Sequence, residues 1–378
     1  MKVIGIIAEY NPFHNGHIHQ IKEIKKLYKD SIIICIVSSS FTQNGSICLI
    51  DKWNKTNILL KHNIDIVVEL PYVYSTQSSD SFASGALSIL KELKIDYLSF
   101  GSECNNIDLL TKISDVELNN KYFDKETKYN IDKGLSYPVS INNALKKLIN
   151  IELKDPNDLL AVSYIKYIMK NNLPISLLPI KRTSNYSSTT EESNIISATN
   201  IRNKLINNED ILSYVPKGTY DILKNYKTSS TYYTLLIYEI YRNNNLKDIL
   251  DIDEGIEHRI LKSTTISNDI NSLICNIKSK RYTYNKISRM LNHILLNFTK
   301  EDALLYRNPQ YIRILGLSTP GKNYINSIKK NVSLPILSKY EKGYSMLEYE
   351  INITRIYSII MNNKNLIEKE YKSHTIIK

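Results

Sequence analysis

Two histidines follow the first apolar segment of the chain at a spacing suited to phosphate chemistry. Residues 3–8 are apolar and run directly into Glu9-Tyr10-Asn11-Pro12-Phe13-His14-Asn15-Gly16-His17, after which apolar residues recur at helical spacing. Gly16 leaves room for a ligand to approach the backbone. The N-terminus of a helix offers unpaired N–H groups and the positive end of the helix dipole. We therefore predict that His14 and His17 are catalytic, bind phosphate groups and stabilise the charge of a transition state.

Two simpler interpretations of these histidines stay open. They could form a helix cap at the surface, or they could bind zinc together with His19. The cysteines give no support for a zinc cluster, because Cys35, Cys48, Cys104 and Cys275 lie far apart without a CxxC pair. We expect no resident metal, and we expect reduced, mostly buried thiols in a cytoplasmic protein.

The overall composition is that of a globular protein. The chain has 378 residues, of which 42% are hydrophobic and 23% are charged, so collagen-like, low-complexity and mostly disordered proteins are excluded. No apolar run approaches the ~20 residues that span a bilayer. The short apolar run after Lys2 has no small-residue cleavage site, and it therefore predicts a buried strand rather than a signal peptide.

The first half of the chain alternates short apolar segments with helical segments, as parallel α/β proteins do. The apolar segments are rich in Ile and Val without polar alternation, which is typical of strands covered on both faces. We predict a doubly wound parallel sheet with strands at 3–8, 31–37, 65–70, 97–101 and 174–180. The predicted helices are 17–28, 52–62, 82–93, a less regular stretch at 107–151, and 159–170. Asp51 and Asp158 are candidate helix caps.

The second half differs in pattern and in charge. Beyond about residue 205 the strand pattern fades, and helical spacing is found at 232–242, 254–262, 287–296 and 347–361. The formal net charge of the chain is +11, and residues 211–378 hold 25 Lys and Arg against 15 Asp and Glu. We predict a nucleotide-binding α/β domain at 1–210, followed by a basic, mostly helical domain at 211–378. This asymmetry favours a polyanionic partner, although a lysine-rich solvated surface would give the same charge.

Residues 270–300 include six Lys or Arg and no Asp or Glu. Tyr282, Lys286, Arg289 and His293 are spaced four, three and four apart, so they would share one face of a helix. A basic face with an aromatic side chain suits contacts to RNA phosphates and stacking on an unpaired base. A solvated helix face has the same pattern. The candidate RNA-binding cations are Lys278, Lys280, Arg281, Lys286 and Arg289.

The string at 14–17 resembles the HxGH signature of the adenylyl-transferring superfamily, which includes class I aminoacyl-tRNA synthetases and nicotinamide adenylyltransferases. Residues 196–202, Ile-Ser-Ala-Thr-Asn-Ile-Arg, resemble the ISSTxIR string found late in those domains. The resemblance implies a Rossmann-like HxGH nucleotidyltransferase fold in which Ser197, Thr199 and Arg202 hold phosphate groups. Ser197 or Thr199 could also simply cap the following helix, a role that uses the same helix terminus.

Further strings extend the resemblance over most of the chain, in order from residue 1 to beyond residue 317. They are IIAEYNPFHNGH at 6–17, DKW at 51–53, VVELPYVYSTQSSDSFASGA at 67–86, LSFGSE at 98–103, PNDLLAVSYIK at 156–166, IKR at 180–182, GIEHRI at 255–260 and KRYTYNKISRMLNHIL at 280–295. Together these strings are similar to one family, the bacterial tRNA(Met) cytidine acetate ligases.

The resemblance implies an enzyme that joins ATP and acetate into acetyl-adenylate and releases pyrophosphate. The acetyl group would then pass to N4 of the wobble cytidine in elongator tRNA(Met). It implies ATP as substrate with Mg²⁺ as its counter-ion, tRNA and acetate as partners, and neither DNA nor a membrane. The ATP site implied by similarity consists of Ile7, Ala8, Glu9, Tyr10, Asn11, Pro12, Phe13, His14, Asn15, Gly16, His17, Ile18, His19, Gln20, Gly101, Asn157 and Arg182.

One loop departs from the family pattern. Family members usually read Gln-Arg-Gly-Glu after the second strand, where this chain has Gln43-Asn44-Gly45-Ser46. Two charged side chains are therefore absent from a loop expected near the site. Two other functions stay open. One is a small-molecule adenylyltransferase, which would not need the basic second half; the other is an RNA-binding protein that keeps the fold without catalysis.

Overall fold

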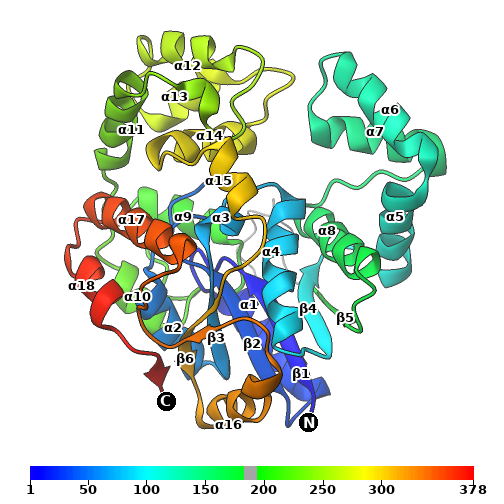
Figure 1. The fold of residues 1–378 in the computed structure, drawn as a ribbon, viewed down its shortest axis with the longest axis vertical. Coiled ribbons are helices and arrows are strands. Elements are labelled where there is room, and N and C mark those ends of the chain that lie inside the picture. The colour runs from blue at the N-terminus through cyan, green and yellow to red at the C-terminus, as the bar shows by residue number, and fades with distance from the viewer. Residues whose placement is uncertain (183–193) are drawn as a thin grey trace.

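A mainly parallel sheet forms the centre of the computed structural model, which describes residues 1–182 and 194–378 (Figure 1). The strand order is β5-β4-β1-β2-β3-β6-β7. The first-half strands are parallel to one another, as predicted for a doubly wound fold. They are β1 (Val3–Ala8), β2 (Ile32–Ser38), β3 (Ile66–Leu70), β4 (Tyr97–Ser102) and β5 (Ser176–Lys181).

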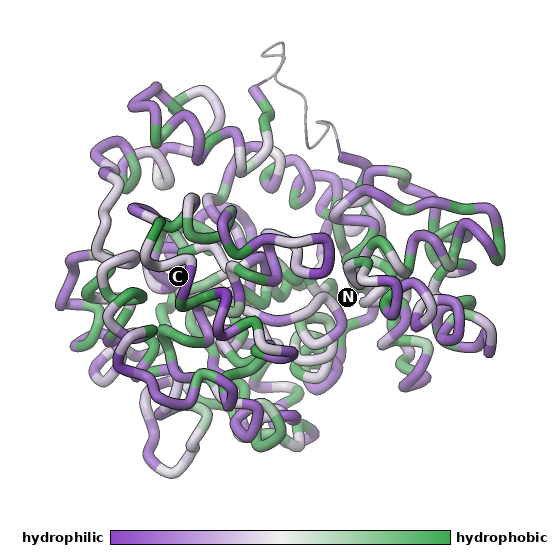
Figure 2. Tube along the Cα trace, turned by 90° about the horizontal axis from the view of Figure 1, so that it is seen from above, coloured by the Kyte–Doolittle hydropathy of each residue, from purple (hydrophilic) through white to green (hydrophobic). Residues whose placement is uncertain are grey.

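Helices cover both faces of this sheet, and alternate strand residues therefore enter two hydrophobic clusters. Ile33 and Val37 face one cluster, which is covered by α1 (Asn15–Leu27), α2 (Lys52–Lys61), α9 (Ala198–Ile206) and α10 (Lys217–Leu223). Ile34 and Ile36 face the other cluster, which is covered by α3 (Tyr72–Ser75), α4 (Ser79–Glu92), α5 (Ile107–Asn119) and α8 (Pro156–Lys170). Figure 2 shows the hydrophobic segments gathered inside the molecule. Burial on both faces explains why β1, β2 and β3 are mostly apolar without alternation.

The second half of the chain contributes strands as well as helices. β6 (Ile312–Leu317) pairs antiparallel with β3, and the short strands β7 (Ile336–Leu337) and β8 (Ile376–Ile377) pair with β6. The expectation that strands fade after residue 205 is wrong here, because the short segment that forms β6, Ile-Arg-Ile-Leu-Gly-Leu, is equally compatible with a buried helix. The division at residue 210 stays a prediction, although a strand of the second half extends the sheet of the first.

Two helical groups project beyond the sheet at the end opposite the N-terminus (Figure 1). One group is α6 (Lys121–Asp132) and α7 (Tyr137–Ile149). The other is α11 (Thr231–Arg242), α12 (Ile256–Thr264), α13 (Ile270–Ile277) and α14 (Tyr284–Leu295). The chain ends with α15 (Lys300–Leu305), α16 (Thr319–Ile328), α17 (Ser345–Ile360) and α18 (Asn365–Lys372). No helix in the described ranges is long and apolar enough to cross a membrane.

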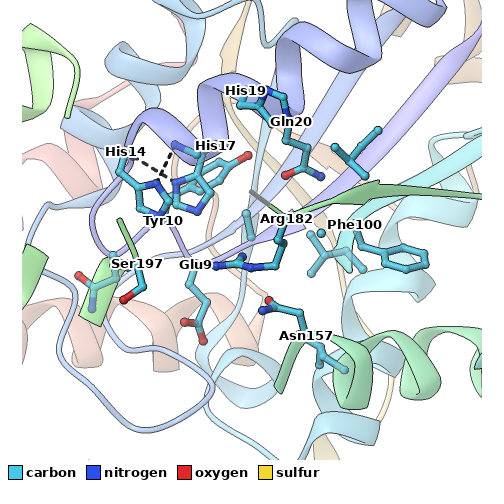
Figure 3. A pocket seen from close by; sticks show the side chains of 18 of the residues that line it. Glu9, Tyr10, His14, His17, His19, Gln20, Phe100, Asn157, Arg182 and Ser197 are labelled. Carbon is cyan, nitrogen blue, oxygen red and sulfur yellow. Dashed lines mark hydrogen bonds between the residues drawn. The ribbon is translucent and has the colours of Figure 1, made fainter. Parts of the chain in front are cut away.

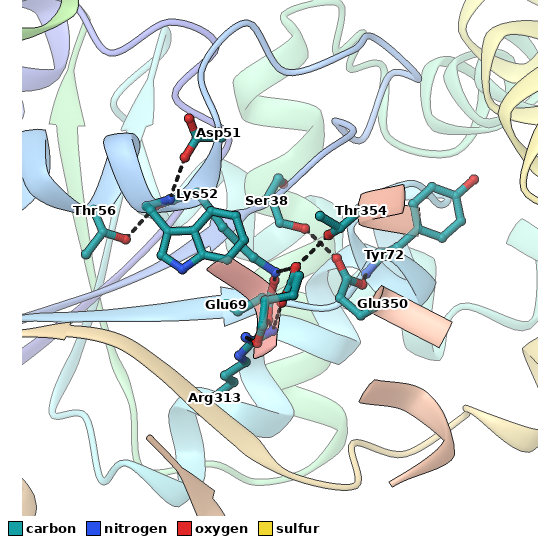
Figure 4. A network of polar contacts seen from close by, with 12 residues as sticks. Ser38, Asp51, Lys52, Thr56, Glu69, Tyr72, Arg313, Glu350 and Thr354 are labelled. Carbon is teal, nitrogen blue, oxygen red and sulfur yellow. Dashed lines mark hydrogen bonds and ion pairs between the residues drawn. The ribbon is translucent and has the colours of Figure 1, made fainter. Parts of the chain in front are cut away.

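A buried ionic network ties the C-terminal helices to the sheet (Figure 4). Lys52 Nζ lies 2.5 Å from carboxylate oxygens of both Glu69 and Glu370. Arg313 Nη1 lies 3.1 Å from Glu69 Oε2 and 2.7 Å from Glu370 Oε2. All four side chains are at most 4% exposed. Such charges are tolerated in an interior only when they are paired, so α2, β3, β6 and α18 depend on one another.

The two predicted caps have different outcomes. Asp51 does cap α2, since its carboxylate accepts from the N–H groups of Trp53 and Asn54. Asp158 lies inside α8, whose N-cap position is Asp155. The cap prediction for Asp158 is wrong because its buried carboxylate is turned to the end of β4, where it accepts from Ser102 Oγ at 2.5 Å.

The cysteines are all free thiols, as expected. Cys35 and Cys48 are buried, whereas Cys104 and Cys275 are exposed. The prediction of mostly buried thiols is therefore wrong for the latter two, which lie in a loop after β4 and on the outer side of α13.

Candidate active site

A cavity of about 230 Å³ opens at the carboxyl edge of the sheet (Figure 3). The chain runs from β1 to β2 and β3 on one side of β1, and it later returns to place β4 on the other side of β1. Such a point of reversal is where open α/β sheets bind ligands. Of the predicted site residues, those that line the cavity are Ile7, Ala8, Glu9, Tyr10, Asn11, His14, Gly16, His17, His19, Gln20, Gly101, Asn157, Arg182, Ser197, Thr199 and Arg202. That ATP binds there stays a prediction.

Four residues of the predicted site do not line the cavity. Phe13 and Ile18 pack into the hydrophobic cluster beneath α1, and Pro12 is buried in the same loop. Asn15 Nδ2 donates to the carbonyl oxygens of Asn194 and Ser213 at 2.8 and 2.9 Å. These residues hold the loop between β1 and α1 in place.

The two signature histidines form a reciprocal cap at the start of α1. His14 Nδ1 accepts from the N–H of Gly16 at 3.0 Å, and His17 Nδ1 accepts from the N–H of His14 at 3.1 Å. The rings stack with centroids 3.7 Å apart. The two rings therefore cap the helix and also line the cavity, and their role in binding phosphate stays a prediction.

This arrangement fixes the tautomer of both histidines. Since each Nδ1 accepts a hydrogen bond, the hydrogen of each neutral ring is on Nε2. Burial, with Arg182 and Arg202 nearby, lowers the pKa of His14 to about 3. Burial, His14 and Arg182 hold the pKa of His17 well below its ordinary value. Both rings are therefore neutral Nε2–H donors at physiological pH.

Two arginines supply positive charge to the cavity. Arg182 follows β5 directly, and its side chain crosses the cavity below the histidines (Figure 3). Arg202 lies on α9, where its guanidinium donates to Asn11 O at 2.7 Å and to Thr199 Oγ1 at 2.9 Å. Ser197 caps α9 by accepting from the N–H of Asn200. The N-termini of α1 and α9 thus meet at one cavity that also holds two cations, an arrangement suited to phosphate groups.

The carboxylate of Glu103, which does not itself line the cavity, positions two residues that do. Glu103 Oε1 accepts from Asn157 Nδ2 at 2.5 Å and lies 3.5 Å from Arg182 Nε. Asp158 fixes this segment in turn, since it accepts from the N–H groups of Glu103 and Cys104. Sequence reasoning gave Glu103 no role, although it lies in the LSFGSE string.

Several other lining residues were missed. They are Phe82, Phe100, Leu160, Tyr164, Ile180, Lys181, Ile195 and Ala198. Most are apolar and sit within helical or strand patterns, so nothing in the sequence separates them from core residues. Lys181 is the exception, since it precedes Arg182 in the IKR string.

The loop at residues 42–46, whose sequence differs from the family pattern, borders the cavity through Asn44, as expected. Asn44 Oδ1 accepts from Thr42 Oγ1 at 2.7 Å and from the N–H of Ser46 at 3.0 Å. Gly45 has φ of +86°, and an added Cβ would lie 2.7 Å from the backbone nitrogen of Arg289. The loop therefore needs glycine where it meets α14.

The predicted basic face of α14 is only partly exposed. Tyr282 and His293 are buried: Tyr282 OH donates to Asp253 O, and His293 Nδ1 lies 2.9 Å from Tyr72 OH. The prediction that they share an exposed face is wrong, because α14 packs against α11 and the segments around Tyr72 and Gly45.

The candidate RNA-binding cations differ in their exposure. Lys278, Lys280 and Arg281 are exposed just before α14, where Arg281 lies 2.6 Å from Glu254. Lys286 is half-buried, with Nζ 5.1 Å from the ring centre of Tyr282. Arg289 is also half-buried, and its Nη1 lies 3.5 Å from Gln43 O. The first three are therefore the cations of this set that are open to a large partner.

Comparisons with known proteins place the chain in a family. A family model described as HIGH nucleotidyl transferase matches residues 1–372. Relatives named tRNA(Met) cytidine acetate ligase from Geobacillus sp. (strain WCH70) and Clostridium perfringens (strain ATCC 13124) are 34% and 36% identical, over 100% of both chains in each case. The chain belongs to the tRNA(Met) cytidine acetate ligase family.

Solved structures of this family agree with the fold. Thermotoga maritima TmcAL without ligand matches with a TM-score of 0.92 at 26% identity, covering 100% of this chain and 99% of that one. The same protein bound with alpha-thio ATP matches with a TM-score of 0.88. The predicted Rossmann-like nucleotidyltransferase fold is therefore confirmed, and so is the resemblance to the tRNA(Met) cytidine acetate ligases.

Proposed function

We propose that the protein activates acetate with ATP as acetyl-adenylate and then acetylates N4 of the wobble cytidine in elongator tRNA(Met). The observation that carries this proposal is the cavity in which two neutral Nε2–H donors and two arginines converge with two helix N-termini. The relatives named for this ligase and the alpha-thio ATP complex of the Thermotoga maritima protein support the same conclusion.

In the first step, a carboxylate oxygen of acetate attacks the α-phosphorus, and the bond to the bridging oxygen of pyrophosphate breaks. Acetate has no proton to lose, so positioning and charge stabilisation suffice. His14 and His17 donate through Nε2 to phosphate oxygens, and Arg182 and Arg202 balance the negative charge. Gly101 and Asn157 shape the nucleoside end of the site. This division of roles explains why the histidines are kept neutral.

Mg²⁺ is proposed to enter with ATP and to be held by phosphate oxygens and water. Within residues 1–182 and 194–378, no group of three His, Cys, Asp or Glu side chains is placed to hold a metal ion by itself. Bound Mg²⁺ would supply further charge neutralisation to the triphosphate.

The tRNA is proposed to lie against the exposed cations before α14. Lys278, Lys280 and Arg281 precede a helix whose N-terminal half contacts the loop at the cavity. A polyanion held there would have its bases close to the site of activation. Because tRNA is the substrate, we also place the reaction in the cytoplasm.

Pyrophosphate exchange tests the activation step. We expect labelled pyrophosphate to enter ATP only when acetate is present, and His17→Ala to lower the exchange rate by ~10²–10³-fold. Exchange that needs a phosphorylated small molecule in place of acetate would indicate a small-molecule adenylyltransferase. Wild-type exchange by His17→Ala would show that the histidine assignment is wrong.

A further inference from the structure

The second step of the proposed reaction needs a proton acceptor, and the following inference rests on that function. The cytidine N4 amino group attacks the acetyl carbon, so an N–C bond forms. The C–O bond to the phosphate breaks, and AMP leaves with the electron pair. One N–H proton must be lost, because the product is an amide. The cavity therefore has to offer a base as well as the donors that activate acetate.

The two signature histidines are unsuited to this task. Their Nδ1 atoms already accept backbone N–H groups, and their Nε2 atoms carry the hydrogens. They can donate to phosphate oxygens, but in these positions neither ring has a free lone pair for a proton. Lys181, Arg182 and Arg202 are cations and equally unable to accept one.

Glu9 is the one carboxylate among the described residues that line the cavity. It directly follows β1, and its side chain extends to the side opposite the histidine rings (Figure 3). Its Oε1 accepts from the N–H of Gln43 at 2.6 Å. From the described parts of the chain, no hydrogen bond reaches Oε2, so this oxygen is left for a ligand.

The position of Glu9 joins the activation site to the RNA side. Its partner Gln43 begins a turn that ends at Gly45, whose carbonyl accepts from Ser288 Oγ at 3.1 Å and Asn292 Nδ2 at 2.7 Å on α14. Asn44, between them, lines the cavity. Glu9 therefore lies where the cavity meets α14, the helix that follows the exposed cations Lys278, Lys280 and Arg281.

The surroundings of Glu9 also suit a base. Burial raises the pKa of Glu9, although the Gln43 N–H, Arg202 and Lys55 act in the opposite direction. Lys55 Nζ donates to the Glu9 backbone oxygen at 2.7 Å rather than to its carboxylate. The raised pKa makes the Glu9 carboxylate a stronger base than an exposed carboxylate.

We propose that Glu9 accepts the proton of the cytidine N4 amino group during acetyl transfer. Oε2 takes the proton as the N–C bond forms, and Oε1 remains held by Gln43. Glu9 takes no part in the activation of acetate, which releases no proton.

The test separates the two half-reactions. Glu9→Gln keeps an oxygen that can accept from the Gln43 N–H but removes the base. In acetate-dependent pyrophosphate exchange, we expect this variant to stay within threefold of wild type. In single-turnover transfer of labelled acetyl from the enzyme-bound adenylate to unmodified elongator tRNA(Met), we expect a loss of ~10²–10⁴-fold. Glu23→Gln is the matched control, because it makes the same change on α1 at a residue that does not line the cavity, and its transfer rate should be unchanged.

Each outcome is decisive. Acetyl transfer by Glu9→Gln at the wild-type rate would overturn the proposal. A selective loss of acetyl transfer in His19→Ala would also overturn it, since it would assign the role of base to His19. An equal loss in both half-reactions, with Glu9→Asp failing likewise, would show that Glu9 serves only ATP binding. If the wild-type protein exchanged pyrophosphate but transferred no acetyl to tRNA, the proposed function itself would be wrong, and the role of Glu9 with it.

Discussion

Gly16→Ala should remove most activity while leaving the fold intact. An added Cβ would lie 2.8 Å from His14 Cε1 and 3.0 Å from His14 Nδ1. Carbon atoms in contact are normally about 3.5–4.0 Å apart, so the ring would have to move by up to about 1 Å. This movement would break the hydrogen bond from the Gly16 N–H to Nδ1. The Nε2–H of His14 would then no longer point to its place in the cavity.

The magnitude follows from two opposing contributions to stability. Losing the hydrogen bond costs about 1 kcal/mol, whereas alanine in a helix is favoured over glycine by about 1 kcal/mol. The free energy of unfolding should therefore change by less than about 1 kcal/mol. Losing one oriented donor in the transition state lowers kcat by ~10²–10³-fold.

Gly218→Ala is a matched control, because Gly218 is the second residue of α10 as Gly16 is of α1. There an added Cβ meets only Ile58 Cγ1, at an ordinary 3.4 Å. The assay is acetate-dependent pyrophosphate exchange, together with urea unfolding of both variants. Activity of Gly16→Ala within twofold of wild type would refute the role given to the orientation of His14. A loss of activity that merely follows unfolding would refute it equally.

Three further changes test the interior and the RNA side. Arg313→Met leaves two buried carboxylates short of a partner and should lower the unfolding free energy by about 3–5 kcal/mol in urea titrations. Burial and the neighbouring Glu69 raise the pKa of Glu350 to about 7. The folded state therefore binds its proton more tightly than the unfolded state, and stability should fall from about pH 4.5 to pH 7 by up to ~1.4 kcal/mol per pH unit. Glu350→Gln should remove this fall. Reversing the charges of Lys278, Lys280 and Arg281 together should weaken tRNA binding and lower the slope of log K against log salt by about 2–3.

Each of these three predictions would be contradicted by a specific result. An unfolding free energy within 1 kcal/mol of wild type for Arg313→Met would mean that the network contributes little. Parallel pH profiles of wild type and Glu350→Gln would show that another group titrates in this range. An unchanged salt slope after the triple charge reversal would place the tRNA elsewhere on the protein.

Local sequence patterns were sufficient to predict strands whose two faces are both buried. β1, β2 and β3 could be predicted because both of their faces are covered, so they are almost entirely apolar. β4 and β5 contain Ser, Gly, Pro or Lys, but their place between helical segments fits the α/β alternation. The signature histidines could be located because a strand, a glycine and a helix start are all local features. β6 could not be separated from a helical segment, since its place beside β3 depends on residues about 245 positions away.

Tertiary packing decided what the sequence left open. Tyr282 and His293 fit a basic, aromatic face by spacing, but their burial depends on contacts with Asp253 and Tyr72. Asp158 has the residue type of a cap, yet its role comes from its contact with Ser102 in β4. In the same way, Glu9 could be placed in the predicted ATP site, but its free oxygen and its link to α14 appear only when distant segments meet.

The complete reaction is the most direct test of the proposed function. Unmodified elongator tRNA(Met) would be incubated with labelled acetate and ATP, with and without the protein, beside other tRNAs. We predict label in N4-acetylcytidine of elongator tRNA(Met) alone, and only when both protein and ATP are present. Absence of label with folded protein, or label spread equally over all tRNAs, would contradict it.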